Sequence, residues 1–235
     1  MINWFMGRRA VPRRSALFCG KPFSRSCLCL LGFLLCGSAW AEWTGVAFEI
    51  ADTRSDWDLD NGTREAKITS LLLQIEERTA TGFTVGGGIG YMTMRVDGND
   101  VVDTKKFDGE FLQVYFRQEF ALGESLTLDA LLDYNLYRGD ENDSDDRDDI
   151  DWNQLGIELG ASIQPGNVRF TPFVSYTNID GDISGSDPTE SFSLDDEYGY
   201  GLRLDFFTES TAFIRLKLKG GSHTGGFLTF VRRYE

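Results

Sequence analysis

Residues 111–138 read FLQVYFRQEFALGESLTLDALLDYNLYR, and the alternation of apolar and polar side chains in this stretch decides the fold. In its first half, one face carries Leu112, Val114, Phe116, Phe120 and Leu122, and the other carries Gln113, Tyr115, Arg117 and Glu119. In its second half, one face carries Leu126, Leu128, Ala130, Leu132, Tyr134 and Leu136, and the other includes Thr127, Asp129, Asp133 and Asn135. A period of two residues is typical of β-strands, so we predict two strands joined by a tight turn at Gly123-Glu124.

The same period recurs on both sides of this hairpin, for example in residues 211–219, where Ile214, Leu216 and Leu218 oppose Arg215, Lys217 and Lys219. We find no helical period from Trp43 onward, and no internal stretch is apolar for the roughly 20 residues of a transmembrane helix. Ten strands are predicted, at about 43–52, 64–78, 82–96, 107–121, 125–138, 150–164, 167–180, 195–208, 211–220 and 226–235.

The connections between these strands differ at the two ends of the predicted sheet. Those after odd-numbered strands are mostly long and polar, at 53–63, 97–106, 139–149 and 181–194, with a shorter one at 221–225. Those after even-numbered strands are tight, around residues 80–81, 123–124, 165–166 and 209–210. This asymmetry favours an all-β, antiparallel up-and-down barrel of ten strands, with eight as the fallback.

The first 41 residues have the composition of a cleaved leader. They contain six basic residues and no acidic one, followed by an apolar run at 27–36 and the sequence Ala39-Trp40-Ala41. We predict a secretory signal peptide at 1–41, cleaved after Ala41, and a barrel at 42–235. All four cysteines lie in the leader, so the mature chain has no disulfide.

Charge excludes one class of partner. The whole chain has 23 basic and 37 acidic residues, and removing the six basic residues of the leader leaves 17 − 37 = −20. Binding of nucleic acid needs clustered Lys and Arg, so no nucleic-acid partner is expected.

Alternation alone does not say which face of the barrel points inward. A soluble lipid-binding barrel would turn its apolar face inside, whereas a membrane barrel turns it towards lipid. Strands of about 12–15 residues favour the membrane, and so do two belts of aromatic residues flanking aliphatic ones on the apolar face. The predicted girdles are Phe83, Phe120, Phe170, Phe206 and Tyr234 near the tight turns, and Tyr91, Tyr134, Tyr176, Tyr198 and Tyr200 near the long connections.

The opposite face carries charges of nearly balanced sign, which suits a narrow polar lumen bridged by ion pairs. The predicted lumen residues are Glu49, Glu76, Arg78, Arg117, Glu119, Asp129, Asp133, Glu158, Arg169, Arg203, Asp205, Arg215, Lys217, Lys219 and Arg233. Gly86, Gly88 and Gly90 share this face, where they are expected to make room for large neighbours.

With these strands, girdles and connections, residues 42–235 resemble the small, OmpA-type outer-membrane β-barrels of Gram-negative bacteria. The resemblance implies a cell outer membrane location, contact with its lipid and lipopolysaccharide, and insertion by the outer-membrane assembly machinery. The last strand departs from the class pattern, because Arg232 interrupts its apolar face and Glu235 follows Tyr234. Pro172 lacks a backbone donor, so an irregularity is expected there.

Two acidic stretches begin like calcium loops, with oxygen donors at alternate positions before a glycine. They contain Asp56, Asp58 and Asp60 in the first, and Asp180 and Asp182 in the second. Neither has Glu at the twelfth position, where Lys67 and Ser191 stand, so weakly bound Ca²⁺ or Mg²⁺ is set against a solvated acidic turn. The acidic run at 140–151 is interpreted as a solvated loop that could bridge divalent ions to lipopolysaccharide.

His223 is the one histidine, at the expected outer rim. The outer-membrane omptin proteases have an Asp two residues before their His, and lipid A deacylases have a Ser two residues after; here those positions are Gly221 and Gly225. No catalytic residue is therefore assigned, and no enzyme is expected. One histidine and no mature cysteine also give no zinc set.

The sequence favours a monomeric barrel with acidic surface loops, a structural or interaction role, and a plugged or narrow polar lumen. A large general porin ranks low, because such porins need about 16 strands. Two alternatives stay open: a narrow channel for small or cationic solutes, and a soluble periplasmic lipid-binding barrel.

Overall fold

The computed structural model describes residues 41–60, 62–97, 104–123, 125–142, 148–185, 189–221 and 223–234. The predicted leader, apart from Ala41, and residues 143–147 of the acidic run at 140–151 lie outside these residues. In the part of the chain that is described, no helix is long and apolar enough to cross a membrane.

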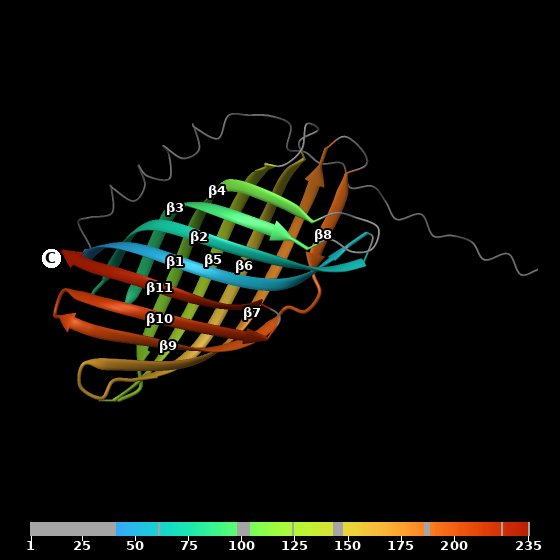
Figure 1. Cartoon of the computed structure of the whole chain (residues 1–235). Helices are drawn as coiled ribbons and strands as arrows, with labels where there is room; N and C mark the ends of the chain where they lie inside the picture. The colour runs from blue at the N-terminus through green and yellow to red at the C-terminus, as the bar shows by residue number, and fades with distance from the viewer. Residues whose placement is uncertain are drawn as a thin grey trace, which may run out of the picture. The chain divides into compact units, whose positions relative to one another are not determined.

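Eleven strands follow one another along the described chain (Figure 1). They are β1 (Ala41–Leu59), β2 (Gly62–Thr79), β3 (Phe83–Val96), β4 (Lys105–Ala121), β5 (Leu126–Glu141), β6 (Asp149–Ile163), β7 (Val168–Ser184), β8 (Glu190–Leu194), β9 (Tyr198–Glu209), β10 (Ala212–Gly221) and β11 (His223–Tyr234).

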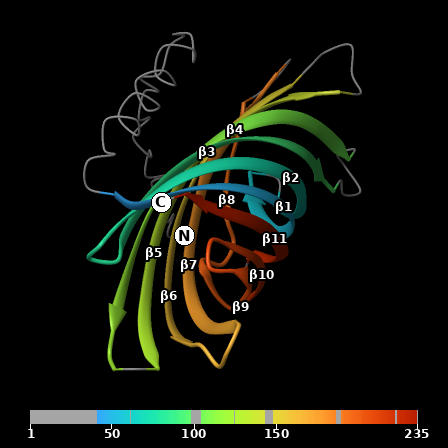
Figure 2. The same ribbon diagram turned by 90° about the vertical axis from the view of Figure 1, so that its left-hand side faces the viewer.

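Ten of these strands close into an antiparallel barrel, which confirms the predicted fold class. Each strand pairs with the next along the chain, except that β7 pairs with β9, and β11 returns to β1. The closing ladder is long: it pairs Thr44 with Tyr234 at one end and Ser55 with His223 at the other. Figure 2, turned by 90° from the view of Figure 1, shows the strands curving around the barrel. Because every edge is paired, the barrel leaves no open sheet edge among its described strands.

Tight turns gather at one end of the barrel, called here the turn end. Gly82, Gly123 and Gly166 each have a positive φ at these turns, a conformation that glycine adopts without strain. The opposite end, called the loop end, carries the longer connections, which follow β3, β5 and β7.

The loop end differs from the prediction, because two expected loops are largely strand. Residues 53–63 continue β1 to Leu59 and start β2 at Gly62, and residues 181–194 hold the end of β7 and all of β8. β8 pairs with β7 on one side and with β1 on the other, through Trp57–Leu194 and Leu59–Phe192. It therefore fills the gap above β9, β10 and β11, and β1–β8 form a second closed ring of eight strands, the outer ring.

The two rings have opposite polarity, as β1 shows along its own length. In the ten-stranded part, Val46, Phe48 and Ile50 point outward and are exposed. Further along, the outward positions hold Asp56 and Asp58, while the inward positions hold apolar Trp57 and Leu59. The lower part is thus apolar outside, and the outer ring is apolar inside, like a water-soluble barrel.

Glycines on the inward face of β3 make room for large neighbours, as expected. A Cβ on Gly86 would lie 2.3 Å from the ring of Tyr115, and one on Gly90 would lie 2.2 Å from the ring of Phe111. The expected irregularity at Pro172 is also present: the β6–β7 ladder pairs Gly160 with Phe173 and Ile163 with Phe170, without the two pairs between them.

Candidate functional site

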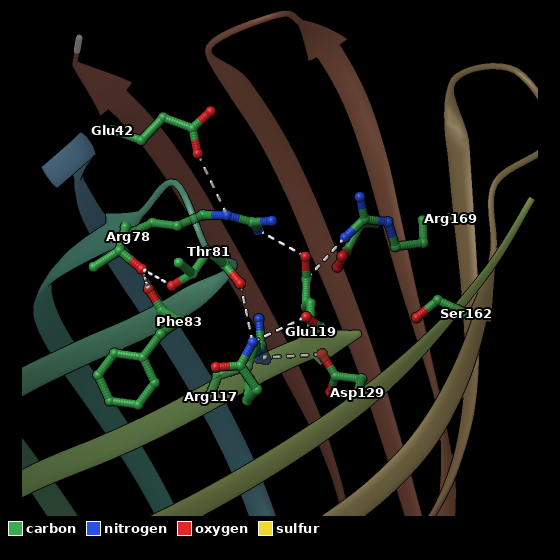
Figure 3. Close-up of polar contacts among 12 residues, drawn as sticks. Glu42, Arg78, Thr81, Phe83, Arg117, Glu119, Asp129, Ser162 and Arg169 are labelled. Atoms are coloured by element: carbon green, nitrogen blue, oxygen red, sulfur yellow. Dashed lines mark hydrogen bonds and ion pairs between the residues drawn. The ribbon is translucent and has the colours of Figure 1, made fainter. Parts of the chain in front are cut away.

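Ion pairs between distant strands connect the wall of the lumen near the turn end (Figure 3). Glu119 on β4 lies between two arginines, 2.7 Å from Arg78 on β2 and 3.1 Å from Arg169 on β7. Arg78 also lies 3.9 Å from Glu42 at the start of β1. One carboxylate therefore links three strands that are far apart in sequence.

A second set of ion pairs lies deeper in the lumen. Arg203 on β9 donates to Asp129 on β5 over 2.7 Å, and both side chains are buried. Arg117 lies 3.5 Å from the other oxygen of Asp129. Arg215 forms a two-point pair with Asp205, at 2.6 and 3.1 Å, the arrangement that fixes a guanidinium against a carboxylate most firmly.

The charged residues that the alternation assigned to the lumen are connected by ion pairs, hydrogen bonds and ring contacts. The structure brings ten of them into the ion pairs given above or below: Arg78, Arg117, Glu119, Asp129, Glu158, Arg169, Arg203, Asp205, Arg215 and Lys217. Lys219 joins the pair of Lys217 with Glu158, Glu49 accepts from Thr229, Glu76 from Tyr115 and Asp133 from Asn135. Arg233 lies over the rings of Trp43 and Phe213.

A polar cavity of about 110 Å³ lies between these groups, at mid-height in the lumen. Its wall includes the carboxylates of Glu49, Asp133 and Glu158, and the ammonium groups of Lys217 and Lys219. Both lysines lie close to the same oxygen of Glu158, at 3.2 and 3.6 Å.

Above the cavity, the outer ring is filled by an apolar cluster that the sequence reasoning missed. The cluster consists of Trp57, Leu59, Ala66, Ile68, Leu72, Met92, Met94, Val96, Phe107, Phe111, Ile150, Trp152, Ile179, Ile183, Phe192 and Leu194, with Tyr137 packed against it.

Aromatic rings form the centre of this cluster. Trp57 stacks on Phe192 with centroids 4.3 Å apart and meets Trp152 edge-on at 5.6 Å. Tyr137 stacks on the other side of Trp152 at 4.3 Å. The signal for this cluster was present in the sequence, because Trp57 and Leu59 alternate with acidic residues in what we interpreted as a polar loop.

The outer surface of the ten-stranded part is an apolar band. Large exposed residues include Phe48, Leu73, Ile89, Leu132, Leu159, Val174 and Phe230. The aromatic residues expected in the girdles also lie on outward positions, and Tyr198 and Tyr200 are 69% and 67% exposed. A band of this kind requires an apolar solvent, so the apolar face does not line an inner ligand cavity as the soluble alternative required.

His223 does not lie at an exposed rim, contrary to the expectation. It begins β11 opposite Ser55, points into the barrel and is 5% exposed. Its Nδ1 atom has no hydrogen-bond partner among the described protein atoms. Gly221, the last residue of β10, has a positive φ, and β11 starts at His223 rather than at residue 226.

The five aspartates proposed for calcium lie on the outside of the outer ring. Asp58 and Asp180 pair with the same residue of β8, Ser193, from opposite sides, and Asp182 accepts from Ser191 over 2.7 Å. The Asp58 carboxylate raises the pKa of Asp195, which follows β8. Within the described residues no three acidic, His or Cys side chains are grouped to hold a metal ion, and the calcium site stays a prediction.

These features define a class. A closed antiparallel barrel with an even number of strands, an outward apolar band and a charged interior is a transmembrane β-barrel of the bacterial outer-membrane type. The chain lies in the outer membrane, with its ten-stranded part in the lipid.

No protein-family profile matches the chain. No curated protein is similar to it either.

Among solved structures, the outer membrane protease OmpT of Escherichia coli shares 7% identity at a TM-score of 0.47, over 82% of this chain and 94% of that one. The translocator domain of the autotransporter NalP of Neisseria meningitidis shares 11% at 0.46, over 90% and 95%. The attachment invasion locus protein Ail of Yersinia pestis shares 13% at 0.43, over 82% and 98%. At such identities and TM-scores, the function must be argued from the residues of this chain.

Proposed function

We propose that this protein is a non-catalytic outer-membrane barrel with a closed lumen, whose outer ring is a rigid acidic platform for contacts at the cell surface. The observation that carries the proposal is the apolar cluster inside the outer ring. The predicted leader at 1–41, a monomeric state, and contact with lipopolysaccharide and the assembly machinery belong to the same proposal.

The closure is supported by what fills the interior at each level. In the outer ring, large apolar side chains occupy the axis, and Trp57 is 0% exposed. A hydrated ion would lose its water there without gaining polar partners. Below the cluster, arginines and carboxylates on non-adjacent strands form ion pairs around a polar cavity, so the apolar cluster is the barrier to ions.

The platform role is supported by the extent of the outer ring. β1 to β7 continue beyond the apolar band, and β8 closes the ring above the shorter strands β9 to β11. A packed interior makes this projection rigid, as in a soluble domain. Its outward face carries Asp56, Asp58, Asp180 and Asp182.

The non-catalytic role is supported by the position of His223. The residue that faces it across the ladder is Ser55, and the charged groups that act on it are Lys217, Lys219 and Glu158. The Nδ1 atom of His223 has no hydrogen-bond partner within the described chain, so no carboxylate orients the imidazole through that atom. We expect His223→Ala to leave lipid A unchanged by mass spectrometry and to alter no peptidase activity.

Conductance in planar lipid bilayers tests the closure. The wild-type barrel is expected to give no steady conductance, whereas the double variant Trp57→Ala, Trp152→Ala is expected to conduct, because it removes two rings from the centre of the cluster. The matched control is Tyr198→Ala, Tyr200→Ala, which removes two exposed aromatic rings from the outer face and is expected to stay silent.

Steady conductance of the wild-type barrel would contradict the closed lumen. If that conductance fell on Asp129→Asn or Asp133→Asn, the narrow cation channel would be supported in its place. Equal conductance of both double variants would show that the apolar cluster is not the barrier.

A further inference from the structure

The lumen cavity contains polar atoms that no protein group satisfies. Glu158 Oε2, Asn135 Oδ1 and His223 Nδ1 are buried and have no hydrogen-bond partner among the described residues. The three side chains are 3%, 2% and 5% exposed, and all of them line the same cavity of about 110 Å³. Buried polar atoms are usually paired, so three of them around one cavity indicate that something else fills it.

The contacts that these side chains already make leave each free atom as a hydrogen-bond acceptor. The Asn135 amide nitrogen donates to Asp133 over 2.9 Å, which leaves its oxygen free as an acceptor. Lys217 and Lys219 both approach Oε1 of Glu158, which leaves Oε2 free. A neutral imidazole provides one acceptor nitrogen. The cavity therefore offers three acceptors to a group that carries several N–H donors.

A free donor lies in the same wall. Arg203 donates to Asp129 through Nη2, and its Nε–H has no partner within the described chain. Arg203 is 3% exposed and lines the cavity. An acceptor on the bound molecule, such as a carboxylate oxygen, would satisfy it.

We propose that this cavity is a binding site for a small zwitterion with a primary ammonium and a carboxylate, the class of a free amino acid. The ammonium supplies three N–H donors to Glu158, Asn135 and His223, and the carboxylate accepts from Arg203. The charges predicted to line the lumen already nearly balance, with eight basic and seven acidic side chains. A zwitterion adds no net charge to this interior, whereas a lone cation or anion would unbalance it.

The size of the cavity fits a molecule of this class. A single water needs roughly 10–15 Å³ of such volume, so about 110 Å³ holds several waters or one molecule of a few heavy atoms. The alternative content is ordered water alone, and the experiment separates the two.

The experiment tests whether the barrel binds the probe during refolding. The full mature chain is refolded from urea into detergent micelles in the presence of radiolabelled glycine, and free probe is then removed. We expect one glycine retained per barrel and a raised midpoint of thermal unfolding, since a ligand bound only by the folded state stabilises it. Methylamine and acetate, which each carry one half of the zwitterion, and glycine betaine, which lacks N–H donors, are expected to be lost.

Two variants address the contacts. Asn135→Leu removes an acceptor at similar size, and Glu158→Gln removes the charge while keeping the shape; both are expected to lower retention at least tenfold in barrels that pass a heat-modifiability check. The control is Ser162→Ala, which lies in the lumen outside the cavity, bonded to Thr171, and is expected to retain glycine like the wild type.

No retention of glycine by the folded wild-type barrel would overturn the proposal and leave water as the content. Equal retention by wild type and both variants would also overturn it, since binding would then lie elsewhere. Both readouts are independent of conductance, so they fail or succeed separately from the closed lumen.

Discussion

Replacing Trp57 by alanine tests whether the outer ring has a packed core that contributes to the stability of the whole barrel. Trp57 is fully buried, stacks on Phe192 at 4.3 Å with an interplanar angle of 3°, and meets Trp152 at 5.6 Å. Its Nε1–H donates to Ser55 Oγ over 2.8 Å, so the ring is held by both apolar and polar contacts. The variant removes the indole and leaves a cavity among rigid neighbours.

The expected loss follows from the burial. Truncation of a fully buried Trp to Ala lowers the free energy of unfolding by about 3–5 kcal/mol, because transfer and cavity costs add. With a urea slope of about 2 kcal/mol/M, the midpoint of unfolding is expected to fall by about 1.5–2.5 M. The assay is reversible urea unfolding in lipid vesicles, followed by tryptophan fluorescence and by gel mobility without boiling.

The matched control is Tyr200→Ala, which also removes a large aromatic ring, but one that is 67% exposed. We expect it to change the free energy of unfolding by less than about 1 kcal/mol. A loss below about 1 kcal/mol for Trp57→Ala as well would refute the reasoning, because a packed core cannot lose an indole so easily. It would mean that the interior of the outer ring is loose or hydrated.

Three further predictions concern other levels of the barrel. Gly90→Ala is expected to lower the free energy of unfolding by about 1–3 kcal/mol in the same urea assay, because its Cβ would overlap the ring of Phe111. The control Gly226→Ala, whose Cβ would lie 3.8 Å from its nearest neighbour, is expected to be near neutral. Equal effects of the two variants would contradict the close packing at Gly90. Arg203→Ala is expected to lower the free energy of unfolding by about 3–5 kcal/mol, because Asp129 stays buried with Arg117 as its more distant partner. The double variant Arg203→Ala, Asp129→Ala is expected to lower it by less than the sum of the two single variants. Strict additivity would show that the pair is not coupled. The Asp58 carboxylate raises the pKa of Asp195, so the folded state holds that proton to higher pH than the unfolded chain does, and stability falls as pH rises from about 4 through the raised pKa. Asp195→Asn is expected to abolish this fall, so its stability relative to wild type should grow between acidic and neutral pH; a constant difference across that range would argue against the Asp58 contact.

The sequence determined most of the lower barrel, because a strand exposes its side chains to two faces in strict alternation. Once Leu112 to Leu136 alternated against Gln113 to Asn135, the antiparallel hairpin and the sorting of residues onto two faces followed. The number of strands followed from the turns. Ten strands were favoured from spacing alone, and the structure closes ten into the barrel.

The outer ring was decided only by the tertiary structure. Trp57, Leu59, Phe192 and Leu194 lie among acidic and small polar residues, and short stretches of this kind resemble solvated loops when read singly. They become strands because β8 finds two partners, β7 and β1, that are far from each other in sequence. The stabilisation from strand pairing and from a shared apolar interior arises only when β8 pairs with both β7 and β1, so local composition does not predict it.

The same reason applies to the lumen. Alternation assigned Glu119, Arg78 and Arg169 to one face, but which carboxylate meets which guanidinium depends on the stagger of strands around the closed ring. His223 was expected at an exposed rim because residues 221–225 were predicted to be a connection, yet the ladder with β1 continues as far as Ser55 and turns the imidazole inward. The face on which a residue lies is a local property of its strand and can be predicted from the sequence. The depth of the residue in the barrel and its contact partner depend on all the strands of the closed barrel, because the stagger between strands sets both.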